Sequence, residues 1–345
     1  MTTRFTVDGR KVSLLGYGAM RLPTVDGGHA NGWAKDGYSE SGIDQKLLNA
    51  QVKYMLDHGV NYFDTSPAYC RGDSEACLGR ALKASGYARG DYVVATKLSN
   101  FAPQQYPLDE CRKMFDKSLE YLQTDYIDNY LLHSVGNGGF KTFSQRYLEN
   151  GALDWCVKLR EEKRIRNLGF SFHGDPKVFE WCLERHGEYK WDFCQIQMNY
   201  VDWLHAKAVN ERNLDAKYLY ERLTELKIPI VVMEPLLGGR LARYNYALAK
   251  ELTPLDPEAS LAKWALRFCG TYPNVMTILS AETAPSAREV LKAYAKAVPE
   301  ELRRADHCTG CGRCFLHCPQ TIDIPKELAV IDEWIDSLKN EEAHR

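Results

Sequence analysis

The sequence predicts an α/β protein built as a (β/α)8 TIM barrel, with a β-hairpin before it and a small cysteine-rich tail after it. Short apolar runs alternate along the chain with longer amphipathic stretches, a pattern typical of parallel βαβ units. The short runs are apolar throughout, as strands buried on both faces are. Eight such units in about 250–300 residues fit a closed barrel better than an open sheet.

The elements follow in order from these patterns. Phe5–Val7 and Val12–Leu15 flank the turn-forming pair Asp8-Gly9, which predicts the hairpin. The eight strands are expected at Leu14–Met20, Asn61–Thr65, Tyr92–Thr96, Ile127–Leu132, Asn167–Ser171, Phe193–Met198, Ile228–Met233 and Val275–Leu279. The helices are expected at Leu47–Asp57, Glu75–Ala84, Asp109–Leu122, Asp154–Glu162, Lys177–Arg185, Ala216–Leu226, Ser260–Phe268 and Ser286–Ala297.

Two long segments and a tail complete the predicted organisation. Thr24–Gln45 and Val135–Asn150 are expected as loops after the first and fourth strands, and loops of that length are usually functional. The barrel domain is expected to span residues 1–297 and the tail residues 298–345. The tail ends in Pro325–Asn340, an amphipathic helix that would either dock the tail onto the barrel or cover the tail's own loop.

Composition excludes several classes of function. The 345 residues carry a net charge of −2 with both signs interspersed, so no nucleic-acid-binding face is expected. No apolar run approaches the ~20 residues that span a bilayer, so no membrane association is expected. The segment Met1–Phe5 lacks the apolar stretch of a signal peptide, which predicts a cytoplasmic protein. In that reducing compartment, eleven cysteines indicate metal ligation and buried thiols rather than disulfides.

Four of the cysteines form a C-x2-C-x2-C-x3-C-P run near the C-terminus. This is the bacterial ferredoxin spacing, and it predicts one 4Fe-4S cluster. Its expected ligands are Cys308, Cys311, Cys314 and Cys318. Gly310 and Gly312 would let the backbone approach the inorganic sulfides.

Some alternatives remain for this run. A structural zinc site with His307 and His317 as spare ligands is one, although zinc sites usually use two separated ligand pairs. In two-cluster ferredoxins the fourth cysteine ligates the other cluster, and this chain has a single run. Either Cys318 closes the cluster, or a remote thiol such as Cys269 does.

Four titratable side chains are expected at the mouth of the barrel. Asp64, Lys97 and His133 end the second, third and fourth strands, and Tyr69 lies in the loop after the second. Chemistry in such barrels gathers at the C-terminal ends of the strands. A nearby ammonium would lower the pKa of the phenol, an Asp would orient the Lys, and a His would bond to a carbonyl oxygen. This set is suited to protonating a carbonyl oxygen while hydride arrives at the carbon.

At these residues the chain resembles the aldo-keto reductase superfamily, in the branch with a C-terminal ferredoxin-type 4Fe-4S motif. The matching stretches run in order through the barrel: Asn61–Tyr69, Ser74-Glu75, Leu78-Gly79, Thr96-Lys97, Leu132–Ser134, Gly169–Ser171, Gln195–Tyr200, Pro235-Leu236 with Gly239, and Ile278–Ser280. The resemblance implies that Tyr69 is the general acid, that Lys97 and Asp64 tune it, and that His133 orients the carbonyl.

The resemblance also implies bound NADP(H), with NAD(H) as the alternative. Ser171 and Gln195 match the positions that hold the nicotinamide carboxamide, and Met233 occupies the place of an aromatic that stacks on nicotinamide in relatives. The expected phosphate-binding segments contribute Glu234, Pro235, Leu236, Gly239, Ser280 and Arg288. Two departures stand out: Phe172 and then His173 follow Ser171 where relatives have Asn, and Arg288 is the one basic residue near for a 2′-phosphate.

The predicted function is therefore an NAD(P)H-dependent oxidoreductase that interconverts a small-molecule carbonyl and alcohol. Its cluster would be structural or would relay electrons to a ferredoxin or flavodoxin partner. A nicotinamide reaction with a carbonyl needs no one-electron carrier, which favours the structural role. The alternatives are a non-enzymatic barrel that senses redox state or nicotinamide, and an enzyme that binds substrate at an open iron. The aromatic and imidazole side chains expected to line the substrate pocket are Trp33, Trp203, Tyr200 and His205.

Overall fold

The computed structural model describes residues 2–25, 29–30, 42–242, 248, 251–252, 254–257, 259–280, 336 and 339. The chain divides into two compact units, and the first, residues 1–25 with 29–282, contains the barrel. The expected domain boundary at 297/298, the eighth helix and the cysteine run lie outside the described residues, as does the expected terminal amphipathic helix apart from residues 336 and 339.

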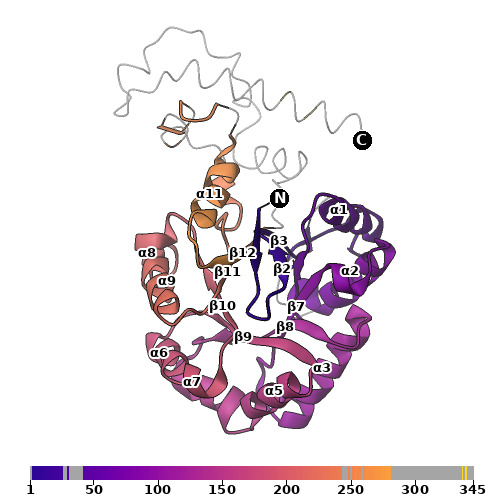
Figure 1. Cartoon of the computed structure of the whole chain (residues 1–345), viewed down its shortest axis with the longest axis vertical. Helices are drawn as coiled ribbons and strands as arrows, with labels where there is room; N and C mark the ends of the chain where they lie inside the picture. The colour runs from indigo at the N-terminus through magenta and orange to yellow at the C-terminus, as the bar shows by residue number, and fades with distance from the viewer. Residues whose placement is uncertain are drawn as a thin grey trace, which may run out of the picture. The chain divides into compact units, whose positions relative to one another are not determined.

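Eight parallel strands close into a barrel, which confirms the predicted barrel (Figure 1). They are β3 (Leu15–Gly18), β6 (Tyr62–Asp64), β7 (Val93–Leu98), β8 (Ile127–Val135), β9 (Ile165–Phe172), β10 (Phe193–Gln197), β11 (Ile230–Met233) and β12 (Val275–Leu279). The last strand pairs with the first, with Ile278 opposite Leu15, so the sheet has no open edge.

Seven of the predicted helices surround the strands, close to their expected positions (Figure 1). They are α1 (Gln45–Asp57), α2 (Ser74–Ala84), α3 (Leu108–Leu122), α5 (Ala152–Glu161), α6 (Pro176–Glu184), α9 (Ala216–Glu225) and α11 (Leu261–Gly270). Side chains cap three of their N-termini: Asp44 accepts from the Leu47 N–H at 2.9 Å, Asp175 from Lys177 at 2.9 Å and Ser260 from Lys263 at 3.2 Å. Short helices are α7 (His186–Tyr189), α8 (Asp202–Val209), η2 (Tyr69–Gly72), η3 (Arg89–Asp91), η4 (Pro103–Gln105) and η6 (Arg240–Ala242).

The N-terminal hairpin is present, but its strands lie about two residues from the predicted ones. It consists of β1 (Thr3–Phe5) and β2 (Lys11–Ser13), with Thr3 opposite Ser13. The prediction assumed a two-residue turn at Asp8-Gly9. Instead, the Thr6 N–H donates to the Arg10 carbonyl at 2.9 Å and the Gly9 N–H donates to the Thr6 carbonyl at 2.9 Å, which makes a longer turn.

The two predicted long loops contain secondary structure, which corrects that expectation. The segment after β8 folds into α4 (Gly139–Phe143) and a π-helix, η5 (Ser144–Leu148). After β3, β4 (Leu22–Pro23) pairs with β5 (His29–Ala30) in an antiparallel ribbon. Glycine-rich composition predicted a loop after β8, but local helical bonds still form once tertiary contacts hold the segment.

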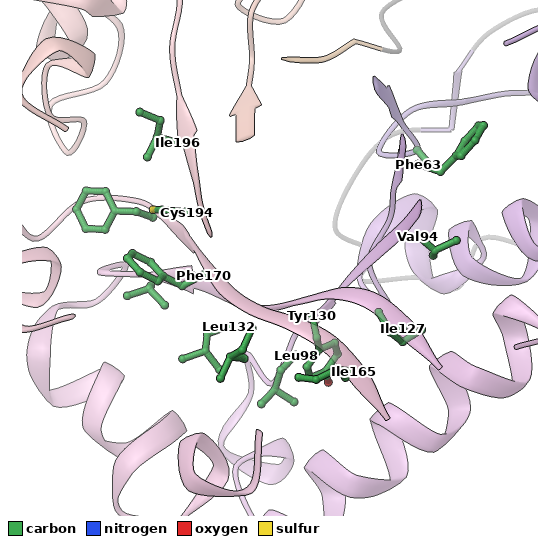
Figure 2. Close-up of a cluster of buried hydrophobic side chains, with 14 of the residues drawn as sticks. Phe63, Val94, Leu98, Ile127, Tyr130, Leu132, Ile165, Phe170, Cys194 and Ile196 are labelled. Atoms are coloured by element: carbon green, nitrogen blue, oxygen red, sulfur yellow. The ribbon is translucent and has the colours of Figure 1, made fainter. Parts of the chain in front are cut away.

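Side chains of each strand alternate between two apolar layers. Tyr62, Val93, Leu131 and Phe193 belong to a cluster inside the barrel. Their neighbours belong to a second cluster between the strands and the helices (Figure 2), which includes Phe63, Val94, Leu132 and Cys194. Apolar packing on both faces explains why the strands read as unbroken apolar runs.

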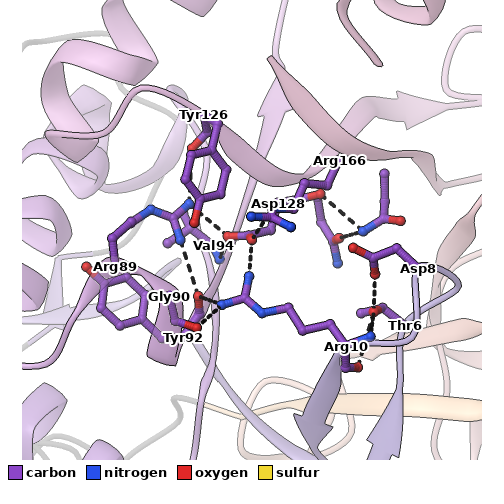
Figure 3. Close-up of polar contacts among 12 residues, drawn as sticks. Thr6, Asp8, Arg10, Arg89, Gly90, Tyr92, Val94, Tyr126, Asp128 and Arg166 are labelled. Atoms are coloured by element: carbon purple, nitrogen blue, oxygen red, sulfur yellow. Dashed lines mark hydrogen bonds and ion pairs between the residues drawn. The ribbon is translucent and has the colours of Figure 1, made fainter. Parts of the chain in front are cut away.

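Asp128 joins the hairpin to the N-terminal end of the barrel (Figure 3). Its carboxylate is 1% exposed and pairs with Arg10 of the hairpin turn and with Arg89, the latter at 2.8 Å. It also accepts the Val94 N–H at 2.9 Å. The Arg89 guanidinium lies 4.1 Å from the ring centre of Tyr126, so it makes a cation–π contact in addition to its ion pair with Asp128. This network is structural and lies at the N-terminal ends of the strands, where Asp128 follows the first residue of β8.

We expect Asp128→Ala to lower the free energy of unfolding by about 3 kcal/mol, because the change leaves partly buried guanidinium groups and the buried Val94 N–H without their acceptor. Urea denaturation measures the loss. The matched control is Asp116→Ala, which removes a carboxylate that is 63% exposed and pairs with Arg164; its expected cost is under about 1 kcal/mol. Equal costs for the two variants would contradict the role assigned to Asp128.

Candidate active site

The inward-facing side chains of the barrel change from apolar to polar toward the C-terminal ends of the strands. Inward positions differ by two residues, so the positions beyond the apolar inner cluster can be read directly from the strands. These positions hold polar side chains on five strands and an apolar one on the sixth: Asp64 on β6, Lys97 on β7, His133 on β8, Ser171 on β9, Gln195 on β10 and the apolar Met233 on β11. The fold therefore gathers these predicted site residues at the mouth of the barrel.

Lys97 and Asp64 form a buried ion pair between β6 and β7. The Lys97 Nζ lies 2.6 Å from Asp64 Oδ1 and donates to the Thr65 carbonyl at 2.8 Å. The two side chains are 1% and 3% exposed. Burial raises the pKa of Asp64, and the Lys97 charge partly offsets that rise. Burial likewise lowers the pKa of Lys97, and Asp64 opposes it.

Tyr69 lies against both Lys97 and His133. The Lys97 Nζ is 4.6 Å from the centre of the Tyr69 ring, and the rings of Tyr69 and His133 are 5.7 Å apart and nearly perpendicular, at 81°. The chain turns sharply directly after Tyr69, because Cys70 and Arg71 adopt left-handed φ angles of 47° and 59°.

The predicted lowering of the Tyr69 pKa is wrong for this cavity. Burial raises the pKa of Tyr69 well above its usual value, and the carboxylates of Asp64 and Glu234 raise it further. The expectation considered the Lys97 ammonium alone, but Asp64 balances that charge. The phenol is therefore protonated at neutral pH.

Residues that the sequence analysis missed hold His133 in place. The Ser99 Oγ lies 2.6 Å from His133 Nδ1, and the Ser66 Oγ lies 3.3 Å from the same atom. Arg146, in the π-helix, donates to the His133 carbonyl at 2.7 Å, as does the Tyr147 hydroxyl at 2.8 Å. Burial lowers the pKa of His133 well below its usual value, and the Lys97 charge adds to the effect, so the imidazole is neutral. The sequence feature that could have identified Ser99 as a site residue is its inward position, two residues after Lys97.

These side chains open into a cavity of about 450 Å³ at the C-terminal mouth. Asp64, Tyr69 and His133 line it together with residues from the β11 and β12 ends: Met233, Glu234, Pro235, Leu236, Leu279 and Ser280. Ser171 is buried nearby and accepts the Ser134 N–H at 2.8 Å. Gly239 follows the lining residue Gly238, and Arg288 lies outside the described residues.

The residues of this cavity fit a nicotinamide coenzyme. Gln195 is 1% exposed, and its buried Oε1 has no hydrogen-bond partner among the described residues, which a carboxamide N–H would supply. Backbone turns at Glu234, Leu237, Gly238 and Gly239, all with positive φ, shape the adjoining wall. The Gly238 N–H already donates to Glu234 Oε2 at 2.6 Å, and Arg21 lies 3.6 Å from Glu234 Oε1.

Of the side chains expected in the substrate pocket, the described ones, Tyr200, Trp203 and His205, do not line this cavity. Trp203 packs 4.5 Å from the Tyr272 ring and also against Phe268, and Tyr200 packs edge-on to Phe268. Trp33 lies outside the described residues. Instead, the wall beyond β9 and β10 is polar and contains His173, Gln197, Asn210 and Asn213.

The described cysteines behave as buried thiols, as predicted. Cys70, Cys77, Cys111, Cys156, Cys182, Cys194 and Cys269 are all buried. Within the described ranges no cluster of three or more His, Cys, Asp and Glu side chains could hold a metal ion. The predicted cluster ligands Cys308, Cys311, Cys314 and Cys318 lie outside those ranges. No helix in the described part of the chain is long and apolar enough to cross a membrane.

We expect acid to destabilise the fold partly through His173. Removal of the His173 ring from solvent lowers its pKa to about 4, and the positive charge of Lys97 contributes to the decrease. Between pH 4 and about pH 6.5, this histidine is therefore protonated more in the unfolded chain than in the folded one. Its contribution to the free energy of unfolding is fully present above about pH 6.5 and is lost as the pH falls toward 4. The loss between pH 7 and pH 5 amounts to about 2 kcal/mol.

Urea denaturation at the two pH values measures this effect in the unchanged protein and in His173→Gln, which should show the smaller loss. His58→Gln, a change at an exposed histidine, is the control and should keep the full loss. An undiminished loss in His173→Gln would contradict the assignment.

Comparison with known proteins agrees with this geometry. A model of the Aldo/keto reductase family matches residues 15–309. The L-galactose dehydrogenase of Arabidopsis thaliana is 28% identical over 285 residues, which cover 82% of this chain and 79% of that protein. A probable voltage-gated potassium channel subunit beta of the same plant is 30% identical over 319 residues, covering 81% and 86%.

Solved structures share the fold. The aldo-keto reductase AKR11C1 from Bacillus halodurans, in its holo form, superposes with a TM-score of 0.62 at 24% identity over 87% of this chain and 91% of that one. The family model covers most of the barrel, and its match includes the buried pair Lys97–Asp64, Tyr69 and His133. The chain belongs to the aldo-keto reductase family and is an oxidoreductase enzyme of that family.

Proposed function

We propose that the protein reduces a carbonyl to an alcohol, and catalyses the reverse oxidation, with NADP(H) as coenzyme and Asp64, Tyr69, Lys97 and His133 as its catalytic residues. One observation carries the proposal: the protonated Tyr69 lies beside Lys97 and neutral His133, in a cavity that also holds the unpartnered Gln195 Oε1. The bound nicotinamide supplies the hydride that goes to the carbonyl carbon.

In this proposal the protein's part is proton transfer and orientation. Tyr69 gives its hydroxyl proton to the carbonyl oxygen as hydride reaches the carbon. The Lys97 ammonium, 4.6 Å from the ring, stabilises the phenolate that remains, and Asp64 holds Lys97 in place. Ser99 bonds to His133 Nδ1, and in this proposal His133 Nε2 binds the carbonyl oxygen.

For the coenzyme, Ser171 and Gln195 would hold the carboxamide and Met233 would pack against the nicotinamide. Glu234, Pro235, Leu236 and Gly239 would border the pyrophosphate, and Ser280 and Arg288 the adenosine phosphate. Arg288 favours NADP(H), because its guanidinium could bind the 2′-phosphate. If Arg288 does not contact that phosphate, NAD(H) would serve equally well. The seven buried thiols support a reducing compartment such as the cytoplasm.

Tyr69→Phe should lower kcat for aldehyde reduction by about 10²–10⁴-fold, because the variant keeps the ring but loses the transferable proton. Steady-state assays of NADPH oxidation measure the loss, and quenching of protein fluorescence by NADPH should show an unchanged Kd. Tyr54→Phe, at a tyrosine that is 59% exposed, is the control and should keep full activity. Retained turnover in Tyr69→Phe would show that Tyr69 is not the proton donor. If the unchanged protein binds the coenzyme but turns over no carbonyl compound, the non-enzymatic sensor is favoured instead.

We also propose that the tail carries one 4Fe-4S cluster held by Cys308, Cys311, Cys314 and Cys318. Cys269 is a poor fourth ligand, because it is fully buried and its Sγ donates to the Met198 carbonyl at 3.3 Å. Burial also raises the pKa of the Cys269 thiol to about 12, which disfavours the thiolate that iron requires. Hydride transfer moves two electrons at once, so a structural cluster agrees with the proposed reaction better than a relay to a ferredoxin or flavodoxin.

Anaerobically purified protein should show a broad visible absorption band and bind about four irons per chain. Cys318→Ser should lose most of the band, whereas Cys269→Ser should keep it. The band should not bleach when NADPH is added, if the cluster is structural. Bleaching would establish electron flow from nicotinamide to the cluster and would direct the search to an electron-carrier protein.

A further inference from the structure

One wall of the active-site cavity contains four polar side chains that are not among the residues proposed to hold the coenzyme. The residues proposed to border the coenzyme phosphates come from the ends of β11 and β12, and those proposed for its carboxamide are Ser171 on β9 and Gln195 on β10. The four other polar side chains are His173 after β9, Gln197 at the end of β10, and Asn210 and Asn213 after α8. All four are neutral hydrogen-bonding side chains or, for His173, an imidazole that is neutral at pH 7 because its pKa lies at about 4. The same cavity contains Tyr69 and His133, so a molecule reacting at Tyr69 has this wall within reach.

His173 offers both a donor and an acceptor to the cavity. A neutral imidazole carries one N–H and one bare nitrogen, and neither ring nitrogen of His173 has a hydrogen bond among the described residues. The backbone of His173 is fixed, since its N–H donates to the Val135 carbonyl at 2.7 Å. The ring therefore meets a ligand from a rigid position at the end of β9.

Asp202 supplies an unsatisfied acceptor behind this wall. Asp202 is 1% exposed. Its Oδ2 accepts hydrogen bonds from Gln197 Nε2 at 2.8 Å and from Asn199 Nδ2 at 2.5 Å. Its Oδ1 is buried and has no hydrogen-bond partner among the described residues. A buried carboxylate oxygen without a donor is costly, so a bound group with O–H or N–H donors is expected there.

A small hollow connects these groups. Asp202 lines it together with His173, Gln197 and Asn213, three residues that also line the active-site cavity. Its volume is about 10 Å³, which is near the space that one hydroxyl oxygen or one water occupies. The hollow is lined by no Lys or Arg among the described residues and includes the Asp202 carboxylate, so it disfavours an anionic group and favours hydroxyls.

We propose that His173, Gln197 and Asp202 form a subsite for hydroxyl groups, and that the substrate is a neutral polyhydroxylated carbonyl compound of the sugar class. This inference rests on the proposed reduction at Tyr69 and adds the substrate class to it. His173 and Gln197 contact hydroxyls in the cavity, and the Asp202 carboxylate accepts from a hydroxyl in the hollow. A site built to bond a hydroxyl discriminates strongly against an analogue that lacks it, because its own polar groups are then left unpaired.

The test compares two aldehydes of equal carbon number, glyceraldehyde and propionaldehyde, with the full-length, cluster-containing protein and NADPH. The unchanged protein should show a kcat/KM at least about tenfold higher for glyceraldehyde. Asp202→Asn and His173→Phe should each remove about tenfold from the glyceraldehyde value while changing the propionaldehyde value less than about threefold. Glu211→Gln removes a carboxylate from the exposed loop between α8 and α9 and should change neither value.

Calorimetric titration with xylitol gives a second readout that needs no turnover. The coenzyme-loaded protein should bind xylitol, and Asp202→Asn should bind it more weakly. Equal losses for both aldehydes, or no preference for glyceraldehyde in the unchanged protein, would overturn the subsite. If neither aldehyde is reduced, xylitol binding that depends on Asp202 would retain the subsite and reject the proposed reaction, whereas absence of xylitol binding would reject the subsite as well.

Discussion

The buried ion pair between Lys97 and Asp64 is the interaction on which the site depends. It places two charges where water does not reach, and it joins the ends of β6 and β7 at 2.6 Å. Such a pair is costly to desolvate and becomes far more costly when one partner is missing, so both side chains must stay together. The Tyr69 ring lies against the ammonium, and the burial that surrounds the pair keeps the phenol protonated and the His133 ring neutral.

The barrel makes this arrangement possible through the two-residue repeat of its strands. In β6, β7, β8 and β10, inward positions near the middle hold apolar side chains that exclude water, and the next inward positions toward the mouth hold polar ones. A one-residue change of register would direct Asp64 or Lys97 into the apolar layer beneath the helices. The apolar interior therefore selects the register, and the register places the site.

Polar groups around the mouth fix His133 through hydrogen bonds to its backbone carbonyl as well as to its ring. Ser99 and Ser66 bond to the His133 ring, and Arg146 reaches from the π-helix to the His133 carbonyl. Arg146 is itself 3% exposed and is satisfied by backbone carbonyls and the Tyr147 hydroxyl rather than by a carboxylate. The segment after β8, with its π-helix, thus orients the site instead of merely connecting two elements.

The sequence by itself determined the eight strands, seven of the described helices and the placement of Asp64, Tyr69, Lys97 and His133 at one mouth, because these follow from local periodicity and from the rule that parallel strands end at one face. It did not determine the register of the hairpin, whose turn is longer than the Asp8-Gly9 pair indicated, or the helices after β8, which form in a glycine-rich segment. It also did not determine the support of His133 by Ser66, which lies far from it in the chain, or by Arg146 from the π-helix. It also misjudged the pKa of Tyr69. Burial and the sum of surrounding charges set a pKa, and only the tertiary structure decides which groups are buried together.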